Sequence, residues 1–115
     1  MATVPPTITP SGGVPRVVWS GIVTGDTINA FTLTEQWGLA GSVQISGTFG
    51  GATVKLQHSN DGTTWFDAYD LNNTAVSATA NAIFEISLSS VYFRPSISGG
   101  SANTVNVILV LRGLY

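Results

Sequence analysis

The sequence predicts an all-β protein: a jelly-roll or related Greek-key β-sandwich of about eight strands with an extended N-terminal arm. Apolar and polar residues alternate in short runs, most clearly over residues 43–49 (VQISGTF). Such a period of two is typical of a strand with one buried face. Turn signals rich in Gly, Asn and Asp separate these runs. No helix longer than the single turn that residues 34–40 could form is expected.

Residues 1–15 (MATVPPTITPSGGVP) differ from the rest, since they hold four of the five prolines and no charge. Proline fixes φ and lacks an N–H donor, which predicts an extended segment rather than a helix or a central strand. Disordered tails are usually rich in charge. We therefore expect an arm that docks on its own domain or on a neighbour, with a frayed terminus as the alternative. Its predicted partner contacts are Val4, Pro5, Pro6, Ile8, Pro10 and Val14.

The remaining residues, 16–115, are predicted to form one β-sandwich domain. Asn60-Asp61-Gly62 is a strong hairpin turn, because Asn and Asp tolerate positive φ and Gly adopts it freely. Pro95 is expected to end the strand before it, and residues 70–81 are expected to form a loop. The eight expected strands cover residues 16–23, 28–34, 43–49, 53–57, 65–69, 84–88, 91–94 and 105–111.

The last of these strands, Val105 to Leu111, is apolar on both faces. Strands with that pattern are usually covered on both sides. A two-layer sandwich leaves one face to solvent, so we expect the second face to meet the arm or another subunit. Its predicted partner contacts are Ile108 and Val110.

Composition favours a protein that works within an assembly. Only 9% of the 115 residues are charged, against roughly 25% in ordinary domains, and a free monomer usually carries more. An ordinary β-domain with a Thr-rich face is the alternative. The chain has only four Lys and Arg residues, and they are scattered along the sequence. Binding to nucleic acid needs clustered positive charges, so nucleic acid is not expected as a partner. No apolar run is long enough to span a membrane, so no membrane partner is expected. The first residues do not resemble a secretory signal, so synthesis in a cytoplasm is expected.

The titratable residues predict no enzyme and no cofactor. His58 is the one histidine, and there is no cysteine. Ser59 is adjacent to His58 in a predicted strand, so the two side chains should point to opposite faces and could not act as a nucleophile–base pair. Asp61, Asp67 and Asp70 could hold calcium, but their spacing matches no known loop and turn capping explains Asp61. Paired carboxylates for glycoside hydrolysis would also need a cleft.

Two tryptophans have different predicted roles. Trp65 is the first large residue after the predicted hairpin, which favours a core position. Trp37 lies in the loop at residues 35–38, where it is predicted either to contact a partner or to plug one end of the sandwich.

Two blocks within residues 43–113 also resemble sequences of a known kind of protein. The blocks VQISGTFGGATVKLQHSNDGTTWFDAY and VYFRPSISGGSANTVNVILVLRG resemble small structural proteins of tailed phages with a galactose-binding-like jelly roll. In these, an S-x-DG-x-x-W hairpin precedes a Y-x-R-P strand. The resemblance implies a capsid decoration or cement protein on the virion surface, a homotrimer whose partners are itself and the major capsid protein.

The same hairpin occurs in carbohydrate-binding and discoidin-like modules. A glycan-binding module of a phage tail or fibre is therefore the alternative function. The chain departs from those modules in having no obvious ligand loop, which puts glycan binding in doubt.

Overall fold

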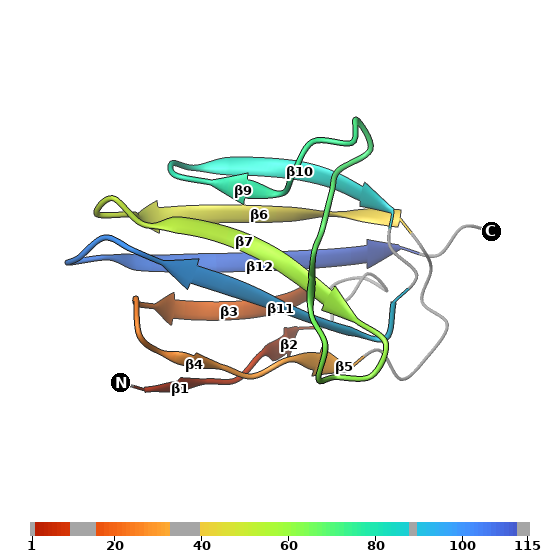
Figure 1. Cartoon of the computed structure of the whole chain (residues 1–115), viewed down its shortest axis with the longest axis horizontal. Coiled ribbons are helices and arrows are strands. Elements are labelled where there is room, and N and C mark those ends of the chain that lie inside the picture. The colour runs from red at the N-terminus through yellow and green to blue at the C-terminus, as the bar shows by residue number, and fades with distance from the viewer. Residues whose placement is uncertain (1, 10–15, 33–39, 88–89, 113–115) are drawn as a thin grey trace.

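The computed structural model describes residues 2–9, 16–32, 40–87 and 90–112, and it is an all-β sandwich (Figure 1). Two five-stranded sheets face each other, and a short parallel pair, β1–β4, lies at one side. Within the described residues there is no helix, and so none that could cross a membrane. The β-sandwich predicted from the sequence is confirmed, whereas its jelly-roll topology stays a prediction.

The first sheet has the strand order β10-β6-β12-β3-β2 and the second has the order β5-β11-β7-β8, with β9 also paired to β7. The strands of the first sheet are β2 (Thr7–Thr9), β3 (Arg16–Ile22), β6 (Ala40–Thr48), β10 (Ala82–Ser87) and β12 (Thr104–Arg112). Those of the second are β5 (Phe31–Thr32), β7 (Thr53–Ser59), β8 (Phe66–Asp67), β9 (Ser77–Ala78) and β11 (Tyr92–Ser98). The parallel pair consists of β1 (Thr3–Val4) and β4 (Thr27–Ile28).

The core lies between the sheets and follows the period of two. Val43 and Ile45 on β6 and Val54 and Leu56 on β7 are all fully buried, as their alternation predicts. Burying one such aliphatic side chain contributes about 1.5–3 kcal/mol. Trp19 on β3 is also fully buried, and sequence reasoning had not singled it out. The largest fully buried side chains are Trp19, Phe93, Ile22, Ile45, Leu56, Ile86 and Leu109.

The described residues form twelve strands where the sequence predicts about eight, because several of these strands are fragments of two or three residues. The predicted strand at residues 28–34 is an example. Within its described part, β4 pairs with β1 while β5 pairs with β11. The chain changes partner between these two pairings, so Asn29 and Ala30 belong to no strand.

The prediction that Pro95 ends a strand was wrong, since β11 continues to Ser98. Pro95 lies opposite Leu56 of β7. Leu56 directs its N–H to Val76 and its carbonyl to the N–H of Ala68, both away from β11. On the other side, β5 pairs only as far as Phe93. The missing N–H of Pro95 therefore removes no bond from the sheet.

The described part of the N-terminal arm, residues 2–9, docks on its own domain. β1 pairs in parallel with β4, and β2 is an edge strand beside β3, a position that a proline-rich segment can occupy. Val4 is 8% exposed and belongs to the core. Asp26 fixes the start of the arm by accepting a hydrogen bond from the N–H of Ala2 at 3.0 Å.

Candidate functional site

The predicted partner contacts fall into three groups. Ile108 and Val110 point outward from β12, half-buried, on the outer side of the first sheet. In the arm, Val4 is buried in the chain's own core at 8% exposure, whereas Ile8 is 50% exposed. Pro5 is exposed and Pro6 half-buried. Pro10, Val14 and Trp37 lie outside the described residues.

The outer side of the first sheet is here called the contact face, and strand register arranges it in rows. One row runs from β10 to β3 as Ile83, Gln44, Ile108 and Val18. The next row runs across the same strands as Glu85, Ser42, Val110 and Arg16. Residues of one row stand side by side, because paired positions in adjacent strands project to the same side of a sheet.

The contact face is open in the part of the chain that the structure describes. Ile83 is 65% exposed, and Gln44, Glu85 and Arg16 are exposed as well. β2 lies beside β3 in the plane of the sheet rather than over it. Residues 2–9 of the arm thus do not cover this face. The row of Ile83, Gln44, Ile108 and Val18, here called the apolar row, is not covered by the described part of the arm and can meet a neighbour.

The outer side of the second sheet carries a polar network. Arg94 donates a hydrogen bond through Nε to Oε1 of Gln57 at 3.1 Å, and Gln57 donates through Nε2 to Oδ1 of Asp67 at 3.2 Å. Lys55 pairs with Asp67 at 3.4 Å. The guanidinium of Arg94 lies 4.2 Å from the centre of the Trp65 ring. The prediction of Trp65 as a core residue was therefore wrong: it is half-buried beneath Arg94.

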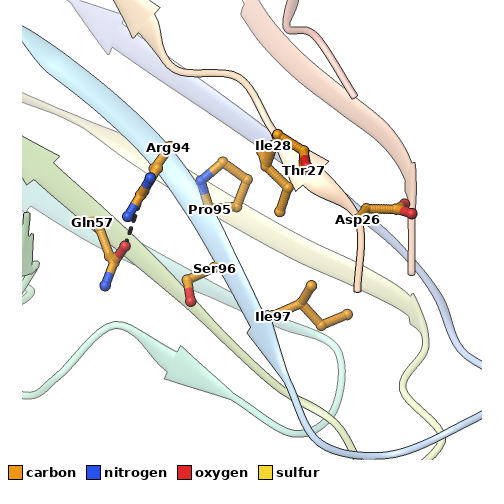
Figure 2. A pocket seen from close by; sticks show the side chains of 8 residues that line it. All are labelled: Asp26, Thr27, Ile28, Gln57, Arg94, Pro95, Ser96 and Ile97. Atoms are coloured by element: carbon orange, nitrogen blue, oxygen red, sulfur yellow. Dashed lines mark hydrogen bonds between the residues drawn. The ribbon is translucent and has the colours of Figure 1, made fainter. Parts of the chain in front are cut away.

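A pocket of about 230 Å³ adjoins this network, between β4 and β11 (Figure 2). Arg94 and Gln57 stand at one end and Asp26 at the other, with an aliphatic middle that includes Pro95 and Ile97. Hydrogen bonds from the N–H groups of Val23 and Ala2 hold the pKa of Asp26 below its usual value. The pocket therefore offers a carboxylate and a guanidinium at opposite ends.

His58 lies at the end of β7, where its Nδ1 is 2.7 Å from the hydroxyl of Ser90. Burial lowers the pKa of His58, which favours the neutral ring at pH 7. Ser59 instead donates to Oδ1 of Asp61 at 2.8 Å. The His58–Ser59 arrangement thus has no nucleophile–base contact.

Two of the three carboxylates that are candidate calcium ligands, Asp61 and Asp70, cap turns. Asp61 accepts hydrogen bonds from the N–H groups of Thr63 and Thr64, and Asp70 accepts them from Asn72 and Thr74. Asp67 belongs to the network of the second sheet. Among the described residues, no three carboxylate, histidine or cysteine side chains form a group able to hold a metal ion.

The cap at Asp61 leads to a prediction about pH. Hydrogen bonds from Thr64, Thr63 and the Ser59 hydroxyl lower the pKa of Asp61 from 3.8 to about 2. Because the folded-state pKa is depressed, this stabilisation is fully present above pH 4 and is lost as pH falls from 4 to 2. In urea unfolding between pH 5 and pH 2, Asp61→Asn should show a shallower loss of stability than the wild type. Identical pH profiles would contradict the role given to this cap.

No protein-family model matches the chain, and no curated protein or solved structure shows significant similarity to it. The fold and its surfaces therefore define the class, an all-β sandwich protein, and any function must be argued from its surfaces and its sequence pattern.

Proposed function

We propose that this chain is a non-catalytic structural protein of a phage virion, a decoration or cement protein that bridges and stabilises neighbouring capsid subunits. The observation that carries the proposal is the open contact face with its apolar row. The resemblance of residues 43–113 to tailed-phage structural proteins supplies the virion setting, the capsid surface, and the major capsid protein and further copies of the chain as partners.

The chemistry of the contact face suits burial. Ile108, Val110 and Val18 are already half-buried, so covering them further orders few additional groups. Each Å² of apolar surface removed from water contributes about 25 cal/mol. Ser42, between Glu85 and Val110, is small and uncharged, and so costs little to desolvate compared with a charged side chain. A neighbouring subunit packed here would gain contact area at low cost.

A capsid-binding measurement tests this function. Capsids assembled from the major capsid protein of the same genome should sediment together with the wild-type chain. Ile108→Lys places a charge in the apolar row and should reduce the bound fraction at least about 10-fold, since burying an unpaired charge is costly. Ser98→Lys, exposed at the end of β11, is the matched control and should bind like the wild type. Absence of wild-type binding would reject the cement function.

A second candidate, a glycan-binding module of a tail or fibre, is favoured by the pocket between β4 and β11. Arg94, Gln57 and Asp26 present hydrogen-bonding groups around an aliphatic middle, and ligand pockets commonly combine a few polar groups with apolar walls. Trp65 is less available for stacking on a sugar, because one face of its ring already carries Arg94.

A glycan array distinguishes the two functions. If the pocket binds a glycan, the wild-type chain should give hits that Arg94→Ala reduces about 10-fold or more, the loss expected when a charged hydrogen-bond donor is removed. Ile108→Lys, on the opposite sheet, should leave those hits unchanged. An array without hits would remove the glycan function and leave the cement function standing.

A further inference from the structure

We propose that a second copy of this chain packs on the contact face, related to the first by a two-fold axis that runs parallel to the strands between β6 and β12. This inference rests on the proposed function because it uses the same contact face. It adds that the molecule covering this face is a second copy of the chain. The order of residues across the first sheet carries the argument.

The two ends of one row carry opposite charges. Glu85 on β10 and Arg16 on β3 are both exposed and share a row with Ser42 and Val110 between them. At a strand spacing of about 4.8 Å, their backbones lie about 14 Å apart, too far for a direct contact. The one ion pair within the described residues joins Lys55 to Asp67 on the other sheet. Glu85 and Arg16 therefore face outward without an ionic partner in the described part of the chain.

A two-fold axis between β6 and β12 exchanges the positions of β10 and β3. It places Glu85 of each copy opposite Arg16 of the other, so that two ion pairs flank the interface. The same rotation places Ile83 opposite Val18 of the second copy. The same two-fold rotation therefore pairs opposite charges at the ends of one row and apolar side chains at the ends of the other. A two-fold interface requires such self-complementary surfaces.

The middle of the interface is compatible with this rotation. Ile108 of each copy meets Gln44 of the other, and the two Gln44 side chains lie diagonally across the axis. An amide group carries both donors and an acceptor, so two amides can satisfy each other. Sheets pack face to face about 10 Å apart with their strands aligned within about 30°, and a rotation about the strand direction keeps them so aligned.

The contact face is large enough for a stable pair. Strands β6 and β12 have nine residues each, β3 has seven and β10 has six. At about 3.3 Å per residue and a strand spacing of about 4.8 Å, they give a face of roughly 500 Å². A specific interface needs about 1,000 Å² in total, which is about 500 Å² per partner. The two copies would then turn their second sheets outward in opposite directions.

Charge exchange tests the pairing. In sedimentation equilibrium the wild-type chain should be a dimer. Arg16→Glu and Glu85→Arg should each weaken dimerisation at least about 10-fold, because like charges then oppose each other twice. The double variant should return to within about 3-fold of the wild type. Lys55→Glu makes the same charge change on the second sheet and should leave dimerisation unchanged. Far-UV circular dichroism verifies that each variant is folded.

A monomeric or trimeric wild type would overturn the inference, as would a double variant no tighter than its single parents. Capsid binding separates this outcome from the proposed function. If the charge exchange restores the dimer but no capsid binding is found, the pairing stands and the cement function fails. If capsids bind without rescue by the double variant, the cement function stands and this pairing fails.

Discussion

Gly50→Ala should lower the free energy of unfolding by about 3 kcal/mol or more, a large part of the 5–15 kcal/mol that stabilises a typical domain. Gly50 follows β6 and has a φ of +57°. A Cβ atom added there would overlap the backbone carbonyl oxygen of Ser101. The N–H of Ser101 also donates to the carbonyl of Gly50 at 3.0 Å. The clash therefore lies between two hydrogen-bonded turns that cannot easily separate.

Gly21→Ala is the matched control. Gly21 has a φ of +68°, but a Cβ added there would meet no atom within 4 Å. Only the left-handed backbone then costs energy, about 1–2 kcal/mol. Urea unfolding of both variants measures the difference. Equal losses at the two positions would show that the close approach of the turns does not determine the stability at Gly50.

Trp19→Ala should destabilise the protein by about 3–5 kcal/mol, the range for removing a large aromatic side chain from a core. The side chain of Trp19 is fully buried, and its Nε1 donates to the carbonyl of Asn29 at 2.8 Å. That bond ties β3 of the first sheet to the segment between β4 and β5. The substitution therefore removes packing between the sheets and leaves the Asn29 carbonyl without its donor.

Two further substitutions separate these contributions in the same urea measurements. Trp19→Phe keeps most of the buried volume and loses the indole N–H, so it should cost about 1–3 kcal/mol. Trp65→Ala changes the same residue type on the half-buried outer side of the second sheet, where we expect less than about 2 kcal/mol. A loss at Trp65 as large as that at Trp19 would contradict the positions of the two side chains.

Much of the fold could be predicted because a strand with one buried face has alternating apolar and polar residues. Val43 and Ile45 alternate with polar residues and enter the core, and the turn at Asn60-Asp61-Gly62 lies where the pattern places it. The strand through Pro95 could not be predicted. A proline is tolerated at this position of β11 because the N–H and the carbonyl of Leu56, opposite Pro95, both point away from β11. That arrangement depends on the neighbouring strands and not on the local sequence.

The contact face could be predicted only in part. The apolar residues on both sides of β12 single out Ile108 and Val110, which do lie on the outer side of the first sheet. The row that joins Glu85 to Arg16 could not be found in this way. These residues are far apart in sequence and come from β10 and β3, which are not neighbours, so the register of three strand pairings is needed to align them.

The central claim, that a neighbour covers the contact face in the assembled state, can be tested with a single thiol. The chain contains no cysteine, so Gln44→Cys places one label at the centre of the face, and Ser98→Cys places a control on the second sheet. Maleimide labelling should be fast at both positions in free chain diluted until it is monomeric. In capsid-bound chain, we expect strong protection at residue 44 and continued labelling at residue 98. Equal labelling of residue 44 in both states would contradict the account.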